Sequence, residues 1–276
     1  MKNLFKRALT GIFFIAVIFS AIYVHPLLFA GVFSVVVGFL IHEFYSLSKY
    51  EGVIWQRYLG IIGGMYLFAS SCLYAGGYVG LEIFIPYILI IMILLISGLY
   101  IRSTNPVIQW GLMLFAQCYC AGMLSLLCFI PYMMSTVYDP WPVLMIFIFI
   151  WLNDTGAYLI GSWKGKRRLF PRISPLKSWE GFFGGLTVVI IASLVFSRFS
   201  LMEMEWYYWL AFAIITTVSA TWGDLIESLF KRTYGAKDSG NILPGHGGVF
   251  DRFDSVVLVS PAIFVFFKII TALSAN

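Results

Sequence analysis

Residues 141–163 read WPVLMIFIFIWLNDTGAYLIGSW, and this stretch decides the fold class. A helix needs about 20 predominantly apolar residues to cross a bilayer. The backbone can be satisfied in hydrocarbon only as a helix or a closed barrel. Asn153 and Asp154 interrupt the apolar run in its second half. The stretch therefore predicts a membrane helix that carries a polar site near one end.

The rest of the chain has the same character. Of its 276 residues, 61% are hydrophobic and 11% are charged, whereas soluble domains contain about 25% charged residues. A soluble chain of this composition could not cover its own surface, so the lipid bilayer is the expected partner. The net charge of +5 does not indicate nucleic acid, because the basic residues are spread over short loops and are typical of a membrane topology signal.

The hydropathy pattern predicts nine membrane spans. The first follows Lys2, Lys6 and Arg7 without a small-residue cleavage site, so it reads as an uncleaved span. The predicted spans cover residues 8–24, 27–45, 58–76, 83–101, 107–130, 141–163, 182–199, 206–227 and 255–272.

Charge then predicts the orientation. With a cytoplasmic N-terminus, all Lys and Arg residues except Arg198 and Lys268 fall on the inner side, and the outer loops contain acidic residues but no Lys or Arg. We expect an all-α polytopic integral membrane protein, most naturally in a bacterial cytoplasmic membrane. Residues 1–139 are expected to form a supporting membrane region, and residues 140–276 a catalytic region with two polar cytoplasmic loops.

The four cysteines lie inside apolar runs. Cys72, Cys118, Cys120 and Cys128 lack the spacing of a disulfide framework or a zinc site, so we expect small buried apolar side chains. His42 and Glu43 are expected to form a polar patch at a helix end.

Two polar segments precede the last two spans. Asp154 costs about 2.5–3.5 kcal/mol at mid-helix, so it should face a cavity, or lock two helices through a hydrogen bond to Asn153 or a tyrosine. The loop after it contains Ser174-Pro175-Leu176-Lys177, where a hydroxyl and an ammonium can clamp a phosphate. Arg167 and Arg168 are adequately explained as topology anchors.

The third polar segment is the richest in charge. Asp224 and Glu227 share a helix face, and Asp251 and Asp254 repeat that spacing where the last helix begins. Capping explains Asp251 alone, but not two acidic pairs among Lys, Arg and His. A divalent cation would relieve the repulsion between these carboxylates, and oxygen ligands favour Mg²⁺. Whether a second, monovalent cation such as K⁺ binds beside it stays open.

These segments resemble CDP-diacylglycerol synthase, also called phosphatidate cytidylyltransferase. The family signature runs without a gap from Ser228 through Lys231, Arg232, Lys237, Asp238 and Pro244-Gly245-His246-Gly247-Gly248 to Asp251-Arg252-Phe253-Asp254. The resemblance is close over residues 140–256. It implies that phosphatidate attacks the α-phosphate of CTP, giving CDP-diacylglycerol and pyrophosphate in phospholipid biosynthesis.

The resemblance also implies roles for the matching residues. The metal ligands are expected to be Asp224 and Asp251, and the catalytic set adds Lys237 and His246. The substrate-binding residues are expected to be Asn153, Asp154, Ser174, Lys177, Ser228, Lys231, Arg232 and Arg252. The residues expected to orient these groups are Glu227, Asp238 and Asp254. Association into homodimers is left open.

Two rival functions remain at this stage. A CTP-dependent lipid kinase would share CTP, metal and the acidic site, but it would release CDP in place of pyrophosphate. A transporter would use Asp154, Asp224 and Glu227 as an ion path and would not depend on nucleotide.

Overall fold

The computed structural model describes residues 2–274 except 53, 101–104, 200, 241 and 243–246, and it leaves the side chains of residues 2–9 and 274 undescribed. Within this part of the chain nearly all regular structure is helical, and the one sheet is a two-stranded hairpin. The predicted all-α polytopic membrane fold is confirmed.

Helices occur at all nine predicted spans. The first, α1 (Lys2–Val24), has a shorter apolar part, Thr10–Val24. Eight others in the described part of the chain are long and apolar enough to cross a membrane. Six of them are α2 (Pro26–Leu47), α3 (Ile54–Ala75), α7 (Trp141–Lys164), α8 (Trp179–Phe196, extended by a turn to Phe199), α9 (Trp206–Thr233) and α10 (Phe250–Ser274). The seventh is α4 (Ile85–Ser97), which flanking turns extend to Leu81–Tyr100. The eighth, Pro106–Tyr132, consists of α5 (Pro106–Ala116), a π-helical segment (Gln117–Gly122), α6 (Met123–Ser125) and short turns up to Tyr132. Their orientation in the membrane stays a prediction.

The chain divides into two compact units. Unit 1 comprises Met1–Phe129 and Tyr234–Phe253, and unit 2 comprises Ile130–Thr233 and Asp254–Asn276. The segment that follows α9 thus belongs with the N-terminal helices. The predicted division into a supporting region, residues 1–139, and a catalytic region, residues 140–276, concerns function and not packing. It therefore stays a prediction.

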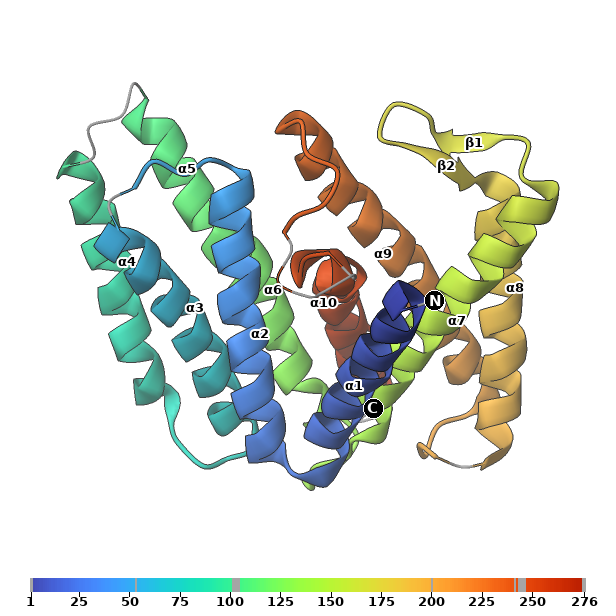
Figure 1. Cartoon of the computed structure of the whole chain (residues 1–276). Coiled ribbons are helices and arrows are strands. Elements are labelled where there is room, and N and C mark those ends of the chain that lie inside the picture. Colours follow the sequence, from blue (N-terminus) through green and yellow to red (C-terminus); the bar gives the residue numbers. More distant parts are fainter. Residues whose placement is uncertain are drawn as a thin grey trace. The chain divides into compact units, whose positions relative to one another are not determined.

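In unit 1, α2 packs against α3, and α3 packs against α4 (Figure 1). Gly64 lets α3 approach closely, because a Cβ there would touch the Ile41 side chain and lie 3.2 Å from Ala121 Cβ. Glu43 of α2 lies inside this unit. The prediction that it belongs to a helix-end polar patch is wrong, because it is only 2% exposed and contacts Ser239, Val249 and Phe250, whereas its neighbour His42 is exposed.

The prediction for the cysteines is partly wrong. Cys72 of α3 and Cys128 form a disulfide, with Cα atoms 4.7 Å apart. Their separation of 56 residues carries no sequence signal, and the packing of α3 against the turn at Leu126–Cys128 brings them together. Cys120 is buried and free as predicted, whereas Cys118 is free and exposed.

In unit 2, α7 packs along α8, and both contact α9. Glycines allow the close approach: a Cβ on Gly156 of α7 would lie 3.1 Å from Gly185 Cα of α8. The loop between α7 and α8 is an antiparallel hairpin of β1 (Arg168–Phe170) and β2 (Ser174–Ser178), drawn in yellow in Figure 1. This hairpin is a local structure that the hydropathy pattern does not predict.

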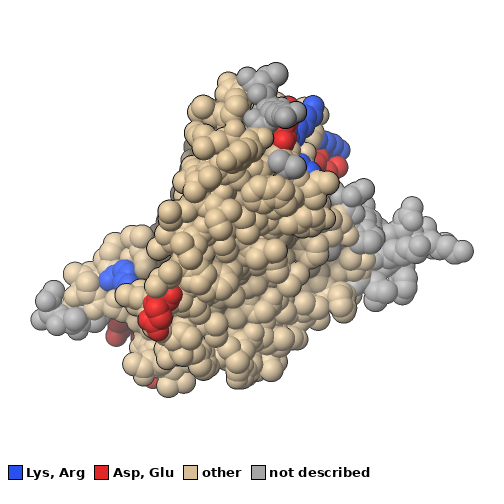
Figure 2. Space-filling model, turned by 90° about the vertical axis from the view of Figure 1, so that its left-hand side faces the viewer, with Lys and Arg blue, Asp and Glu red and all other residues tan. Residues whose placement is uncertain are grey.

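The surface agrees with a lipid environment. α4 exposes Ile88, Leu89, Met92, Ile93 and Ile96. Figure 2 shows one face on which a broad uncharged area separates charged side chains near its upper and lower edges. Apolar side chains exposed in this density mark a membrane-contacting surface.

Helix packing in unit 1 is testable at Gly64. We expect Gly64→Val to lower the free energy of unfolding by about 1–3 kcal/mol, because the added methyl groups overpack the contact with α2. Gly31→Val is the matched control, since a Cβ at Gly31 meets nothing within 4 Å. Thermal unfolding in detergent measures both variants, and equal midpoints would contradict the packing described.

Candidate active site

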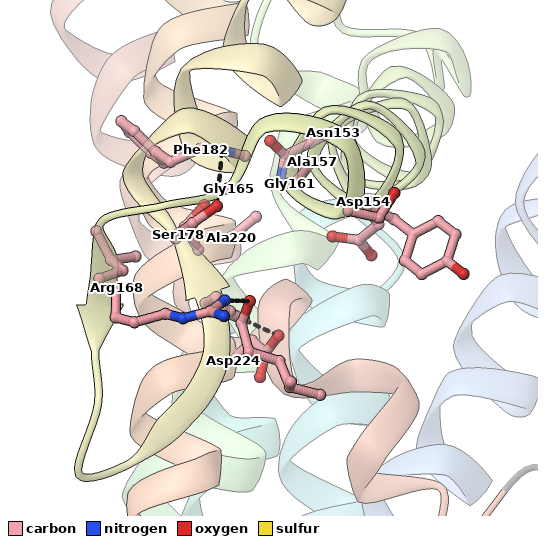
Figure 3. Close-up of a pocket in the computed structure, with 17 residues that line it drawn as sticks. Asn153, Asp154, Ala157, Gly161, Gly165, Arg168, Ser178, Phe182, Ala220 and Asp224 are labelled. Atoms are coloured by element: carbon pink, nitrogen blue, oxygen red, sulfur yellow. Dashed lines mark hydrogen bonds and ion pairs between the residues drawn. The ribbon is translucent and has the colours of Figure 1, made fainter.

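A cavity of about 550 Å³ lies in unit 2. It is bounded by the second half of α7, the hairpin, the start of α8 and the middle of α9 (Figure 3). Four predicted site residues line it: Asn153, Asp154, Lys177 and Asp224. Small residues such as Ala157, Gly161 and Ala220 line it too and leave room for a ligand.

Asp224 makes two polar contacts at the cavity. Its Oδ2 lies 2.5 Å from Lys177 Nζ, and its Oδ1 accepts a hydrogen bond from Ser228 Oγ at 3.2 Å. Both side chains of the ion pair are about 30% exposed, so water and a ligand can reach them. Lys177 is held in place by β2, and Asp224 by α9.

Two further carboxylates lie beside this ion pair. Asp224, Glu227 and Asp254 each offer an oxygen within 4.8 Å of the others. Glu227 is fully buried and pairs with Lys231 one turn along α9, at 2.6 Å. Gly223 lets α9 approach α10, because a Cβ there would lie 2.7 Å from the Asp254 carbonyl oxygen. Three carboxylates beside two ammonium groups leave a formal negative charge, and an all-oxygen donor set suits Mg²⁺.

Asn153 and Asp154 occupy adjacent positions on α7 but different environments. Asn153 is 4% exposed and lies against Gly185 of α8, where any Cβ would overlap its Oδ1. Asp154 is exposed and lines the cavity. The alternative that Asp154 locks two helices through a hydrogen bond stays a prediction.

The hairpin places only part of the predicted phosphate clamp. Lys177 lines the cavity, whereas Ser174, at the start of β2 opposite Phe170, does not. The basic residues at the end of α9 contact protein groups: Lys231 pairs with Glu227, and Arg232 Nε donates to the Ile173 carbonyl oxygen at 3.3 Å. Their roles in substrate binding stay predictions.

The remaining predicted residues belong to unit 1. Lys237, Asp238 and Arg252 are exposed, and His246 lies outside the described residues. Asp251 Oδ2 accepts hydrogen bonds from Ser239 N at 3.0 Å, Ser239 Oγ at 2.9 Å and Gly248 N at 2.9 Å. Asp251 thus holds Ser239 and Gly248 to the start of α10. Whether it shares a metal with Asp224 stays a prediction.

Comparison with known proteins places the chain in a family. The model of the Cytidylyltransferase family matches residues 5–270. A phosphatidate cytidylyltransferase of Bacillus subtilis is 32% identical over 96% of this chain and 97% of its own length. Phosphatidate cytidylyltransferases of Staphylococcus epidermidis and Staphylococcus aureus are 48% identical over 121 residues, which is 44% of this chain and 46% of theirs.

The chain belongs to the cytidylyltransferase family. The family resemblance drawn from the signature residues is therefore confirmed.

In this family member, sequence reasoning missed several residues of the cavity. Ser178 lines it and caps α8 by accepting a hydrogen bond from Gly181 N at 3.1 Å. Serine before an acidic first turn, here Glu180, is the usual signal of such a cap. Arg168 also lines the cavity and donates to the Leu176 carbonyl oxygen at 3.2 Å, although its sequence context indicates only a topology anchor.

The two lysine–carboxylate pairs should differ in their effect on stability. We expect Lys177→Met to change the free energy of unfolding by less than about 1 kcal/mol, because partly exposed ion pairs contribute little. Lys231→Met removes an ammonium from a fully buried carboxylate, so we expect a loss of about 3–5 kcal/mol. Denaturant unfolding in detergent measures both, and a larger loss for Lys177→Met would contradict this assignment.

Proposed function

We propose that this protein is a phosphatidate cytidylyltransferase that converts CTP and phosphatidate into CDP-diacylglycerol and pyrophosphate. The observation that carries the proposal is the alignment with the Bacillus subtilis enzyme of that name, which spans nearly the whole of both chains. The cavity of unit 2 supports it, because acidic side chains from membrane-spanning helices meet basic side chains from the hairpin there.

The reaction needs no nucleophile from the protein. A phosphate oxygen of phosphatidate attacks the α-phosphorus of CTP. The bond from that phosphorus to the oxygen bridging to the β-phosphate breaks, and pyrophosphate leaves with the electron pair. The protein has to hold two anions against each other and to keep the attacking and leaving oxygens in line.

Lys177 and Arg168 supply positive charge on the cavity wall. Lys177 is paired with Asp224, so it becomes available to a phosphate oxygen when Asp224 gains another counter-ion. Binding of nucleotide and binding of cation at this wall are therefore expected to favour each other. Asn153 and Asp154 lie where the polar part of a substrate would enter between α7 and α8.

The acidic residues fit Mg²⁺. Asp224 and Asp251 are the proposed ligands, and Asp254, whose oxygen lies within 4.8 Å of Asp224 and Glu227 oxygens, fits as well. A bound Mg²⁺ would neutralise charge on the triphosphate and on departing pyrophosphate. Glu227 is buried and held by Lys231, which suits an orienting role. A monovalent cation beside Mg²⁺ and a homodimeric state stay open alternatives.

The protein is an integral membrane protein. We place it in the bacterial cytoplasmic membrane with its site on the cytoplasmic face, because basic residues collect at that side of the predicted topology. Phosphatidate would then enter sideways from the bilayer, and CTP from water.

The reaction is tested with detergent-purified protein, phosphatidate, Mg²⁺ and CTP labelled at the α-phosphate. We expect label in the lipid phase, release of pyrophosphate and loss of both on chelation. Diacylglycerol in place of phosphatidate is the control and should take up no label. Lipid labelled from γ-labelled CTP with polyprenol, or nucleotide-independent ion flux, would contradict the proposal in favour of a kinase or a transporter.

The metal ligands are tested with Asp224→Asn and Asp251→Asn. We expect each to lower kcat/KM by about 100-fold or more, because each removes charge that stabilises the transition state. Glu203→Gln is the matched control, since Glu203 is exposed in a loop outside the site. Near-normal turnover of Asp251→Asn at saturating Mg²⁺ would show that Asp251 is not a ligand.

A further inference from the structure

Glu43 is a buried acidic residue in α2 to which the reaction assigns no role. It lies near the C-terminal end of α2, which finishes at Leu47, and the helix dipole disfavours a negative charge there. Its side chain is also almost completely removed from solvent. Nothing local to α2 explains a carboxylate at this position.

The explanation is a contact with a remote segment of unit 1. Glu43 Oε1 accepts a hydrogen bond from Val249 N at 3.0 Å, and Oε2 accepts one from Phe250 N at 2.8 Å. These amides stand at the first turn of α10, where backbone N–H groups have no partner inside the helix. Glu43 therefore caps α10 from more than 200 residues away in the sequence.

Ser239 connects this cap to Asp251. Its hydroxyl oxygen lies 3.0 Å from Glu43 Oε2 and 2.9 Å from Asp251 Oδ2. The hydroxyl carries one proton, so it donates to one of the two carboxylates at a time while lying against both, and Ser239 N donates to the same Asp251 oxygen. The orientation of Asp251 thus depends on Glu43 through one side chain.

Glycines of the same segment fit around the Glu43 carboxylate. A Cβ on Gly240 would lie 2.7 Å from Glu43 Oε1, and a Cβ on Gly248 would overlap both Glu43 Oε2 and Ser239 Oγ. Gly247, between them in the chain, has a positive φ of 81°. The backbone approaches the carboxylate more closely than any other residue type would allow.

We propose that Glu43 is a positioning residue of the cytidylyltransferase site: it anchors Ser239, Val249 and Phe250 and thereby sets the orientation of Asp251. This inference rests on the proposed function, because it assumes that Asp251 acts in the reaction. Through Glu43, the N-terminal helices would contribute a polar residue to the site, although all residues of the family signature lie after residue 227.

The contact is tested by hydrogen–deuterium exchange on the full chain in detergent. In Glu43→Gln we expect the amides of Gly248, Val249 and Phe250 to exchange at least about 10-fold faster, since glutamine lacks the charge and presents an N–H₂ group to one donor. Peptides of α7–α9 should not change. Ser34→Ala is the matched control on the same helix, because Ser34 bonds only to the Ala30 carbonyl oxygen in the contacts described.

The positioning role is tested by kinetics on the same samples. We expect Glu43→Gln to lower kcat by about 10- to 100-fold, as loss of a residue behind a ligand commonly does. KM for CTP and phosphatidate should stay within about threefold, since loss of a transition-state contact lowers kcat and leaves ground-state binding. Faster exchange with unchanged kcat would overturn the proposal.

Two further outcomes are decisive. An inactive wild-type protein would overturn the proposed function and the positioning role together, whereas the exchange result would still report on the Glu43 contact. If Glu43→Gln does not fold, Ser239→Ala decides, because it removes the bridge and leaves the cap. We expect it to lower kcat by about fivefold or more, and normal kcat with normal exchange would overturn the proposal.

Discussion

A charge inside a membrane protein has to find its counter-charge or its hydrogen-bond donors within the protein, and this constraint shapes every polar feature described here. Glu227 meets it with Lys231 one helical turn away. Asp224 meets it with Lys177 from a different element. Glu43 has no cation in its described contacts and accepts hydrogen bonds from two backbone amides, with the Ser239 hydroxyl, which it shares with Asp251, at 3.0 Å. The three carboxylates differ in how easily a ligand could replace their present partners.

That difference separates structure from chemistry along α9. Glu227 is fully buried and lies one turn from Lys231 on the same helix, so their ion pair stabilises the fold and is poorly suited to breaking when a ligand binds. The pair of Lys177 and Asp224 is partly exposed at a cavity and joins a hairpin to a helix. Because an exposed pair contributes little to stability, it can be broken at little cost when phosphate or a cation binds. The pair of Lys177 and Asp224, which contributes less to stability, is therefore the one that can take part in binding.

The spans could be predicted because hydropathy is local: residues 27–45 and 141–163 became Pro26–Leu47 and Trp141–Lys164. The sequence singles out Asn153 and Asp154 as polar residues in an apolar run, Lys177 as part of a phosphate clamp and Asp224 as one of two paired carboxylates. All four line one cavity, and their roles stay predictions. The hairpin, the disulfide of Cys72 with Cys128 and the burial of Glu43 were not found. Each of these features depends on residues that come into contact only after the helices pack, and no residue spacing in the sequence predicts such contacts.

Glu43 shows most clearly why local reasoning stops there. Judged within α2, a carboxylate near the helix C-terminus beside an exposed histidine is an ordinary polar end. Judged with Val249 and Phe250, it completes the N-terminus of another helix, where a negative charge is favoured. The same contact explains Gly240 and Gly248, because the backbone there has to come close to the carboxylate of Glu43, a residue far away in the sequence. Gly248 of the family signature therefore serves to seat a carboxylate of the protein itself.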